Sequence, residues 1–470
     1  MANALVWLRR DLRLHDNPSL AQAVADGYEP IPVYVHAPEE ESPWTTGAAS
    51  SAWLHHSLVS LSSDIQRLGG QLILAKGNSF QELTRLMRAS KSKALYFSNC
   101  YEPNLQARDA KIESAFKDNG VVVHRFNSSL LFEPWQIQTG SGTPYRVFSP
   151  FWRNVCSQLM LRNAYPDIDR LTAFTKADSI SIDELHLLPK LNWHESFWQH
   201  WQPGESGALE MLDIFCDGAI TGYKEQRNLP DRTGTSKLSP HLHFGEISPH
   251  QIWRRIEALK SDESTQADIT HYKSELGWRE FSNHLLHHFP QSCNSNLNPR
   301  FDRFDWVEPD AESLSRWQHG MTGIPIVDAG MRELWQTGWM HNRVRMIVAS
   351  YLCKNLRYHW LHGARWFWDT LVDADLANNS QGWQWTAGTG CDAAPYFRIF
   401  NPVTQSERFD PQARYIKRWL PEIEKLPVPL VFAPWQKPEQ SKLLAPDYPT
   451  IPIVDLAESR RLALAAYSSR

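Results

Sequence analysis

Residues 4–8 read ALVWL, a short apolar run that is followed at once by the charged turn RRDLRLHDN at residues 9–17. Four further apolar runs occur at 31–36, 71–75, 94–98 and 121–126, and helical patterns lie between them, for example at 51–68 and 79–89. Strands that alternate with helices indicate a parallel sheet. We therefore predict a doubly wound, Rossmann-like α/β domain over residues 1–130. The first turn lacks the GxGxxG pattern, so it does not carry the usual dinucleotide fingerprint.

The rest of the chain changes character twice. Residues 131–205 are less regular and rich in Pro, Trp and polar residues, which is typical of a long connector over the surface. From residue 206 onward the strand patterns end and helical periodicity dominates, at 249–259, 268–288, 324–337, 341–359 and 456–468. The sequence thus predicts an α/β domain, an interdomain connector at 131–205 and an all-α domain at 206–470.

The composition is that of an ordinary globular protein of two or three domains, with 470 residues, 42% of them hydrophobic and 21% charged. The formal net charge is −4, so any polyanionic partner must be bound by a local basic patch. Tryptophan is over-represented, with 21 indoles, which suggests stacking surfaces or a redox role.

The cysteines and the N-terminus favour a reducing compartment. The six cysteines are scattered and form no CxxC pair, which argues against a zinc or iron–sulfur site and against a disulfide framework. The N-terminus reads as a strand rather than a signal peptide, and no run of 18 apolar residues is present. We expect a cytoplasmic protein without a membrane span or a metal.

The stretch DADLANNSQGWQW at residues 373–385 brings two carboxylates, amides and two indoles together. It has no metal-ligand spacing and no obvious nucleophile, so it resembles a pocket for a large, flat, polar cofactor. Asp373 and Asp375 could bind a ligand, pair with Arg345 or Arg279, or act as a general acid/base couple. They could equally be turn and cap residues, which is the better reading of an isolated DxD.

Two helical patterns place polar and aromatic side chains on one face. Glu275, Trp278 and Arg279 are spaced i, i+3 and i+4 and therefore share one face of a helix. They could line a pocket; the alternative is a solvated Glu–Arg pair with the indole in the core. Asn342 and Met346 also share a face, together with Arg345; an amide can bind the edge of a heterocycle, and a thioether offers a polarisable contact. The alternative is a helix N-terminus with ordinary basic residues.

The segment GTSKLSP at residues 234–240 combines a glycine, hydroxyls and a cation. Such a segment can present backbone N–H groups to a phosphate, although its spacing is not that of a P-loop. The alternative is a loop that ends in a serine N-cap.

Taken together, the order and spacing of these motifs resemble the photolyase/cryptochrome family, and within it the DNA photolyases that repair cyclobutane pyrimidine dimers. The resemblance runs from WLRRDLR at 7–13 through YRVFSPF at 145–151, and is densest between residues 223 and 400. Its most specific runs are 338–346, 373–385 and AAPYFRIFN at 393–401. The family's fold consists of an α/β domain, a long connector and a helical domain that binds FAD, which agrees with the pattern predicted above.

The resemblance implies a cofactor site. Asn379 would lie opposite flavin N5, where an uncharged amide suits a reduced anionic flavin; plant-type signalling cryptochromes carry an acid at that position. The residues expected to hold the FAD phosphates are Tyr223, Thr235, Ser236, Lys237, Leu238 and Ser239. Those expected around the flavin and its ribityl chain are Arg279, Asn342, Arg345, Asp373 and Asp375.

The resemblance also implies an electron-transfer chain of Trp383, Trp360 and Trp306, which would photoreduce oxidised FAD by hopping between indoles; the alternative for any one of them is core packing. The lesion pocket would be lined by Glu275, Trp278, Asn342, Met346 and Trp385. Three arginines, Arg227, Arg343 and Arg398, would meet DNA phosphates.

The implied reaction is a light-driven DNA repair that is redox-neutral. Excited reduced FAD gives one electron to the dimer, the cyclobutane ring splits, and the electron returns. The dimer must leave the duplex, which costs less than for intact bases because its pairing and stacking are already lost. The implied partner is UV-damaged DNA, and we expect the protein to be a monomer.

Two related activities are the alternatives. Photolyases for (6-4) photoproducts place two histidines in the pocket, in a pattern like HHxxRH, whereas residues 341–346 here read HNRVRM. Cryptochrome-type blue-light photoreceptors alter the lesion pocket and append a disordered tail, whereas this chain keeps Glu275, Trp278, Met346 and Trp385 and ends at Arg470.

Many relatives carry a second, light-harvesting chromophore. In folate-binding photolyases an acidic residue commonly follows the Asn of a segment like 101–104, but here that residue is Leu105. The segment SPWTTGAASSAW at 42–53 also differs from the simplest folate-binding pattern. The first choice is a folate (methenyltetrahydrofolate) held differently, by stacking on tryptophan; a deazaflavin, a flavin or an empty site are the alternatives.

Overall fold

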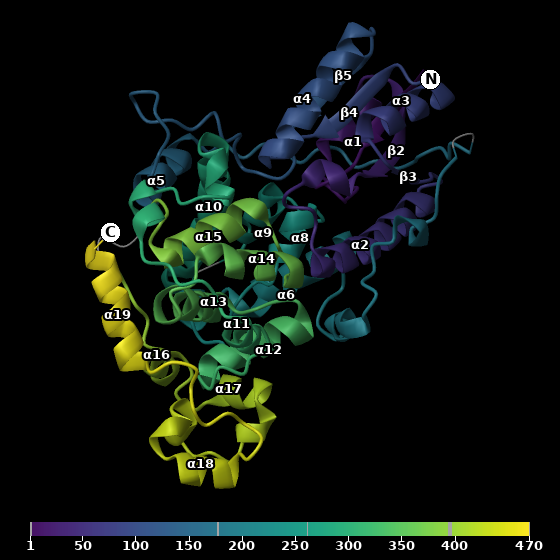
Figure 1. Ribbon diagram of the computed structural model, residues 1–470. Helices are drawn as coiled ribbons and strands as arrows, with labels where there is room; N and C mark the ends of the chain where they lie inside the picture. The colour runs from purple at the N-terminus through teal and green to yellow at the C-terminus, as the bar shows by residue number, and fades with distance from the viewer. Residues whose placement is uncertain (1, 176–177, 261, 393–396, 470) are drawn as a thin grey trace.

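A parallel five-stranded sheet forms the N-terminal part of the molecule, with strand order β3-β2-β1-β4-β5 (Figure 1). The computed structural model describes residues 2–469 except 176–177, 261 and 393–396, so part of the run at 393–401 lies outside the described residues. Every predicted strand is present, with ends shifted by three residues or fewer. The strands are β1 Ala2–Trp7, β2 Tyr28–His36, β3 Ile73–Lys76, β4 Ala94–Ser98 and β5 Val122–Phe126.

Both faces of the sheet are buried, because successive side chains of a strand point to opposite faces. Ala4 and Val6 of β1 join a cluster with residues of α1 (Pro18–Ala25) and α2 (Ala48–Arg67). Leu5 and Trp7 join another with residues of α3 (Ser79–Ser90) and α4 (Pro103–Asp118). The prediction of a doubly wound α/β domain is confirmed.

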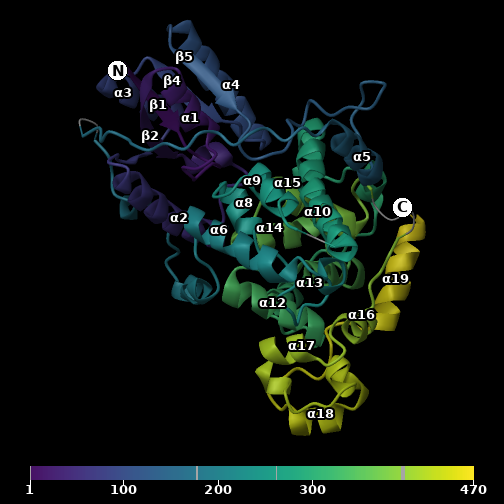
Figure 2. The same ribbon diagram turned by 180° about the vertical axis from the view of Figure 1, so that it is seen from behind.

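The second part of the chain is helical, as predicted, and the irregular segment before it, which contains α5, runs over the surface (Figure 2). The boundaries at residues 130 and 205 stay a prediction. None of the described helices is long and apolar enough to cross a bilayer. The helices are α5 Phe148–Gln158, α6 Glu205–Ile214, α7 Tyr223–Gln226, α8 Ser239–Phe244, α9 Pro249–Glu257, α10 Glu263–His288, α11 Ala311–Gln318, α12 Pro325–Thr337, α13 Asn342–Ser350, α14 Trp360–Thr370, α15 Leu376–Ala387, α16 Pro402–Phe409, α17 Arg414–Trp419, α18 Pro438–Leu444 and α19 Leu456–Ser469.

One predicted helix is wrong in extent. The pattern at 341–359 suggested a continuous helix, but α13 ends at Ser350 and is followed by a widened helical turn, Tyr351–Asn355. The helix cannot continue because Arg357 adopts a left-handed conformation, with φ of +55°. The next helix, α14, begins after His359, whose side chain caps it by accepting from the backbone N–H of Leu361.

The turn after β1 joins the sheet to the helical part. The backbone N–H of Leu12 donates to the carbonyl of Phe244, the last residue of α8, at 3.1 Å. The buried guanidinium of Arg13 donates to the carbonyls of Gly245, at 2.9 Å, and of Ser128, at 3.1 Å. These contacts fix α8, and with it the neighbouring cavity wall, relative to the sheet.

This junction predicts a large effect of Gly245→Ala on stability. Gly245 has φ of +66°, and a Cβ there would lie 1.9 Å from the carbonyl oxygen of Arg10, so the backbones of α8 and the first turn would have to separate. We expect a loss of more than about 3 kcal/mol in the free energy of unfolding, measured by urea denaturation.

Gly27→Ala is the matched control. Gly27 also has a positive φ, +80°, but no heavy atom lies within 4 Å of an added Cβ, so we expect only the conformational cost of about 1 kcal/mol. Equal losses for the two variants would contradict the close approach of the two segments.

Candidate functional site

A cavity of about 590 Å³ lies among α10, α13 and α15, with α7 and the segment before α8 on its other side. Its size is within the range of small-molecule and cofactor sites. Most of the residues singled out in the sequence line it. They are Tyr223, Arg227, Ser236, Ser239, Glu275, Trp278, Arg279, Asn342, Arg343, Arg345, Met346, Asp373, Asp375, Asn379, Trp383 and Trp385.

Asp373 and Asp375 have separate partners although they are two residues apart. Asp373 accepts from Arg345 Nη2 at 2.9 Å and from Ser239 Oγ at 2.6 Å. Asp375 is the N-cap of α15 and accepts from the backbone N–H of Asn378 at 2.8 Å. Asp375 is thus a cap residue and Asp373 pairs with an arginine, which were two of the alternatives for this pair of aspartates. Both carboxylates line the cavity.

The electrostatics around Asp375 leave a polar atom for a ligand. Burial would raise the pKa of Asp375, but His243, Arg279 and the backbone N–H of Asn378 lower it to about 2. Nδ1 of His243 lies 3.9 Å from Asp375, too far for a hydrogen bond, and has no such partner among the described residues. Burial lowers the pKa of His243, whose ring lines the cavity.

Two side chains of α15 face the cavity through close packing against α14. Asn379 donates from Nδ2 to the carbonyl of Ala364 at 2.9 Å, which leaves its Oδ1 as the amide atom available to a ligand. The ring of Trp383 lies against Gly363, where an added Cβ would be 2.0 Å from the indole. Only glycine at position 363 permits this approach.

Glu275 and Trp278 of α10 also line the cavity. Glu275 forms a bidentate ion pair with Arg227, with Nη2 2.7 Å from Oε2. Trp278 stacks on Phe148 of α5, with ring centroids 3.8 Å apart and planes 8° apart. Phe148 belongs to the motif at 145–151, so the sequence already marked this residue. Its contact with Trp278 is known only from the fold.

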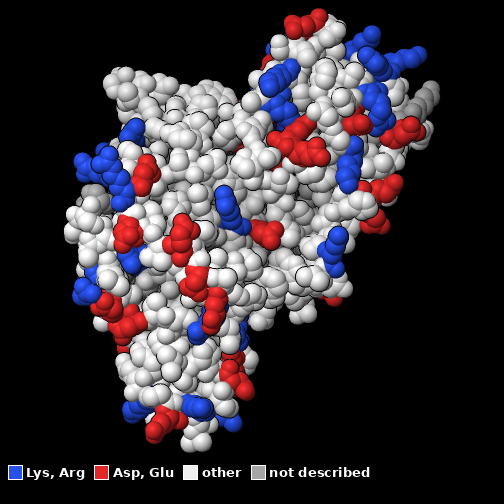
Figure 3. Space-filling view, in the orientation of Figure 1, with Lys and Arg blue, Asp and Glu red and all other residues white. Residues whose placement is uncertain are grey.

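Arginines gather near Arg343. Its Nη2 donates to Asn228 Oδ1 at 2.5 Å, and its guanidinium lies 4.4 Å from the ring centroid of Phe409. Burial and the charges of Arg227, Arg408 and Arg398 lower the pKa of Arg343. The two other predicted arginines are thus close to it, and Arg408 is a fourth member that the sequence did not reveal. Elsewhere both signs of charge are interspersed, as Figure 3 shows for one face.

The three predicted tryptophans differ in depth. Trp383 lines the cavity, Trp360 is fully buried, and Trp306 is half-buried. Trp360 lies one helical turn before Gly363, the residue that contacts Trp383. The sequence did not suggest His359, which contacts both Trp306 and Trp360. Its ring centroid lies 5.0 Å from that of Trp306 and 5.6 Å from that of Trp360.

Three of the predicted phosphate-binding residues, Thr235, Lys237 and Leu238, are not among the described residues that line the cavity. Leu238 is buried in a hydrophobic cluster, and the ammonium of Lys237 lies near two indoles. The neighbouring Ser236 and Ser239 do line it. Side chains of this segment therefore point in different directions, two serines to the cavity, Leu238 to the core and Lys237 to the indoles.

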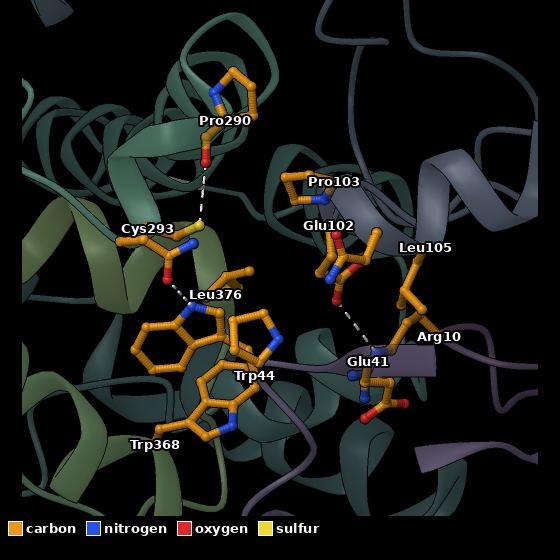
Figure 4. A pocket seen from close by; sticks show the side chains of 13 residues that line it. Arg10, Glu41, Trp44, Glu102, Pro103, Leu105, Pro290, Cys293, Trp368 and Leu376 are labelled. Carbon is orange, nitrogen blue, oxygen red and sulfur yellow. Dashed lines mark hydrogen bonds and ion pairs between the residues drawn. The ribbon is translucent and has the colours of Figure 1, made fainter. Parts of the chain in front are cut away.

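A second, smaller groove lies between the α/β domain and the helical part (Figure 4). Trp44 and Trp368 meet edge to face in it, with ring centroids 5.4 Å apart. Glu102 lies 3.7 Å from Arg10, and Leu105 is beside them. Its volume is about 80 Å³, so a larger molecule would lie in it only in part.

Comparison with known proteins identifies the family and the fold. The DNA photolyase family model matches residues 4–170, and the model for the FAD binding domain of DNA photolyase matches residues 272–469. The chain belongs to the photolyase/cryptochrome family. The second match includes most of α10 and all of α13 and α15, the helices around the cavity.

Members of the photolyase/cryptochrome family with both kinds of name are similar to this chain. A deoxyribodipyrimidine photo-lyase of Agrobacterium fabrum is 45% identical, over 100% of this chain and 98% of that protein. Cryptochrome-1 of Arabidopsis thaliana is 34% identical, over 97% of this chain and 69% of that protein. The crystal structure of a bacterial class III photolyase from Agrobacterium tumefaciens superimposes with a TM-score of 0.94 at 44% identity, over 100% and 98% of the two chains.

Proposed function

We propose that this protein is a DNA photolyase that binds FAD and uses light to split cyclobutane pyrimidine dimers in UV-damaged DNA. The observation that carries the proposal is that one cavity combines a polar cofactor site with an aromatic wall and an arginine cluster. The similarity to a deoxyribodipyrimidine photo-lyase over the whole chain supports it. We also propose that it acts as a monomer in the cytoplasm, where bacterial DNA is accessible.

The residues of the cavity suit FAD. Arg345 and Arg279 offer charged donors, Asp373 and Asp375 offer acceptors, and the buried Nδ1 of His243 has no hydrogen-bond partner among the described side chains. When bound and reduced, FAD supplies the excited electron for ring splitting. We propose that Asn342, Arg279, Arg345 and the two aspartates surround the flavin, and that Tyr223 and the segment at 235–239 hold the phosphates.

Asn379 is the proposed contact of flavin N5. Because its Nδ2 donates to the carbonyl of Ala364, the residue would meet N5 through the acceptor Oδ1. An amide oxygen accepts from a protonated ring nitrogen without adding charge, which suits the reduced anionic flavin. A carboxylate at this position would place a second negative charge beside the ring.

For the lesion, we propose contact with Glu275, Trp278, Asn342, Met346 and Trp385. The two indoles provide apolar faces for the saturated rings, and Glu275 would hydrogen-bond to a thymine carbonyl and stabilise the charge that develops as the radical anion forms. Arg227, Arg343 and Arg398 would bind the DNA backbone.

The two related activities are less well supported. A (6-4) photolyase needs a pair of pocket histidines, but Asn342 and Met346 occupy the corresponding positions on the cavity wall. A photoreceptor is the second alternative, since Cryptochrome-1 covers 97% of this chain at lower identity. The retained Glu275, Trp278 and Trp385 favour repair.

The test of the proposed function is repair of a thymine-dimer oligonucleotide by the purified, reduced protein under blue light, followed by recovery of thymine absorbance. Glu275→Ala should lower the quantum yield of repair about tenfold, because a hydrogen bond to a charged group is worth about 1.5–3 kcal/mol. Glu263→Ala, at the exposed start of α10, is the control. Absence of repair with reduced FAD bound would exclude the photolyase reading, and loss of FAD in Glu275→Ala would exclude the role of Glu275.

The tryptophans have a separate proposed role as an electron path from Trp306 through Trp360 to Trp383. The half-buried position of Trp306, the burial of Trp360 and the place of Trp383 at the cavity support it, as do the ring contacts of His359 with Trp306 and Trp360. The path would serve reduction of the cofactor and not repair itself.

We therefore expect Trp306→Phe to slow photoreduction of oxidised FAD at least tenfold, because phenylalanine is much harder to oxidise than an indole. Repair by the chemically reduced variant should stay within a factor of two of the unmodified protein. Trp335→Phe, on α12, is the control for the loss of a partly exposed indole. Unchanged photoreduction in Trp306→Phe would show that electrons enter elsewhere.

For the second chromophore, we propose a folate, methenyltetrahydrofolate, at the groove of Figure 4. Trp44 and Trp368 offer the stacking surface. Leu105 stands where folate-binding photolyases commonly have an acidic residue, and Glu102 and Glu41 supply carboxylates in its place. Such carboxylates can accept from the amino and imino groups of a pterin.

A flavin-type chromophore is disfavoured at the other plausible position. Parallel α/β sheets bind ligands beyond the carboxyl ends of the strands where the order reverses, here between β1 and β4. That place is filled by Arg9, which donates to Asp109 at 2.7 Å and stacks over Trp7 at 4.1 Å and Phe97 at 4.9 Å.

Trp44→Leu should lower the folate content about tenfold after incubation of the purified protein with methenyltetrahydrofolate, since stacking on an aromatic ring is worth about 1–3 kcal/mol. The ratio of the near-ultraviolet band to the flavin band measures it, and Trp335→Leu should leave it unchanged. Binding of a deazaflavin that Trp44→Leu does not reduce would contradict the proposed groove.

A further inference from the structure

Lys237 has an unusual backbone conformation at the edge of the proposed cofactor site. Its φ is +52°, in the left-handed region, and Leu238 after it has φ of −84° and ψ of −1°. The left-handed region is unfavourable for a residue with a Cβ atom. A left-handed residue next to a right-handed one turns successive backbone N–H groups toward the same side, a geometry that binds anions.

The side chain of Lys237 points away from the cavity into an indole cage. Its ammonium lies 5.6 Å from the ring centroid of Trp201 and 5.7 Å from that of Trp339, both within the range of cation–π attraction. The two rings meet edge to face, with centroids 6.2 Å apart. Trp201 is fixed in turn, because its Nε1 donates to the carbonyl of Thr337 at 2.8 Å.

The cage is connected to the cavity wall. Nε1 of Trp339 donates to Ser239 Oγ at 3.4 Å, and Ser239 Oγ donates to Asp373 at 2.6 Å. The guanidinium of Arg345 lies on Trp339 as well, 5.8 Å from its centroid, and pairs with Asp373. Trp339 therefore holds Lys237 while it contacts the network that faces the cavity.

We propose that Lys237 is a positioning residue for FAD. The attraction between its ammonium and the two indoles offsets the cost of its left-handed backbone, and that backbone keeps Ser236 and Ser239 facing the cavity on either side. This inference rests on the proposed function, because it assumes that the cavity holds FAD. It replaces the expectation that the ammonium itself contacts the phosphates.

The test compares the rate of FAD release from holoenzyme carrying Lys237→Ala, Lys237→Gly and Lys237→Arg. Alanine loses the cage contact and still has a Cβ, so release should be about tenfold faster. Glycine adopts a positive φ without strain, and arginine keeps the cation–π contact, so both should remain within about threefold of the unmodified protein. Release is followed by the rise in flavin fluorescence at low and high salt.

The outcomes separate the alternatives. If the ammonium touched the phosphates, the Lys237→Gly and Lys237→Ala proteins would release FAD equally fast, and release from both would lose its salt dependence. That result, or an unchanged rate of release from Lys237→Ala, would overturn the inference. A general folding defect would lower the thermal midpoint of the Lys237→Ala protein, and Lys237→Gly would not restore it. That result would also overturn the inference. Unmodified protein that binds no FAD would overturn the proposed function together with this inference.

Discussion

The buried guanidinium of Arg13 is the constraint on which the arrangement of the two parts depends. It donates to Gly245, Asp16 and Ser128, and so ties the end of α8, the first turn and the segment after β5 together. A buried charge is tolerated only when its donors are satisfied and opposite charges are near; Asp16, Asp11 and Glu205 supply them. Removing this side chain would leave several carbonyls of separate segments without a donor.

The position of α8 then decides the cavity. Ser239 at its start and His243 near its end both line the cavity, while its last carbonyl is bonded to the first turn. The α/β domain thus acts on the proposed flavin site through backbone contacts and not through a ligand of its own. The same junction brings Trp44 of the N-terminal part against Trp368 of α14, which creates the second groove. Both proposed chromophore sites are consequences of one interface.

Local signals predicted the strands, because alternation of apolar runs with helical patterns depends only on neighbours in the chain. They could not predict that 341–359 is broken, since the left-handed Arg357 leaves the apolar pattern intact. In the site, the resemblance supplied residues that the fold brings together from five helices, α7, α8, α10, α13 and α15. The resemblance placed Lys237 among the phosphate contacts. The direction of the Lys237 side chain, however, depends on its own φ and on Trp201, which lies 36 positions earlier in the chain. Pairings such as Arg227 with Glu275 likewise require the folded distance.

That last pairing links the proposed DNA contact with the proposed chemistry. In the free protein the carboxylate of Glu275 is neutralised by Arg227, so neither group is fully exposed to a new partner. A phosphate near Arg227 would compete with the carboxylate for the same bidentate donors, and Glu275 would then be free to hydrogen-bond to the lesion. Burial and the charges of the surrounding arginines lower the pKa of Arg343, and these like charges favour an anion at this place. In the proposed function, backbone binding and lesion recognition would therefore be coupled through one ion pair, even though the net charge of the protein is −4.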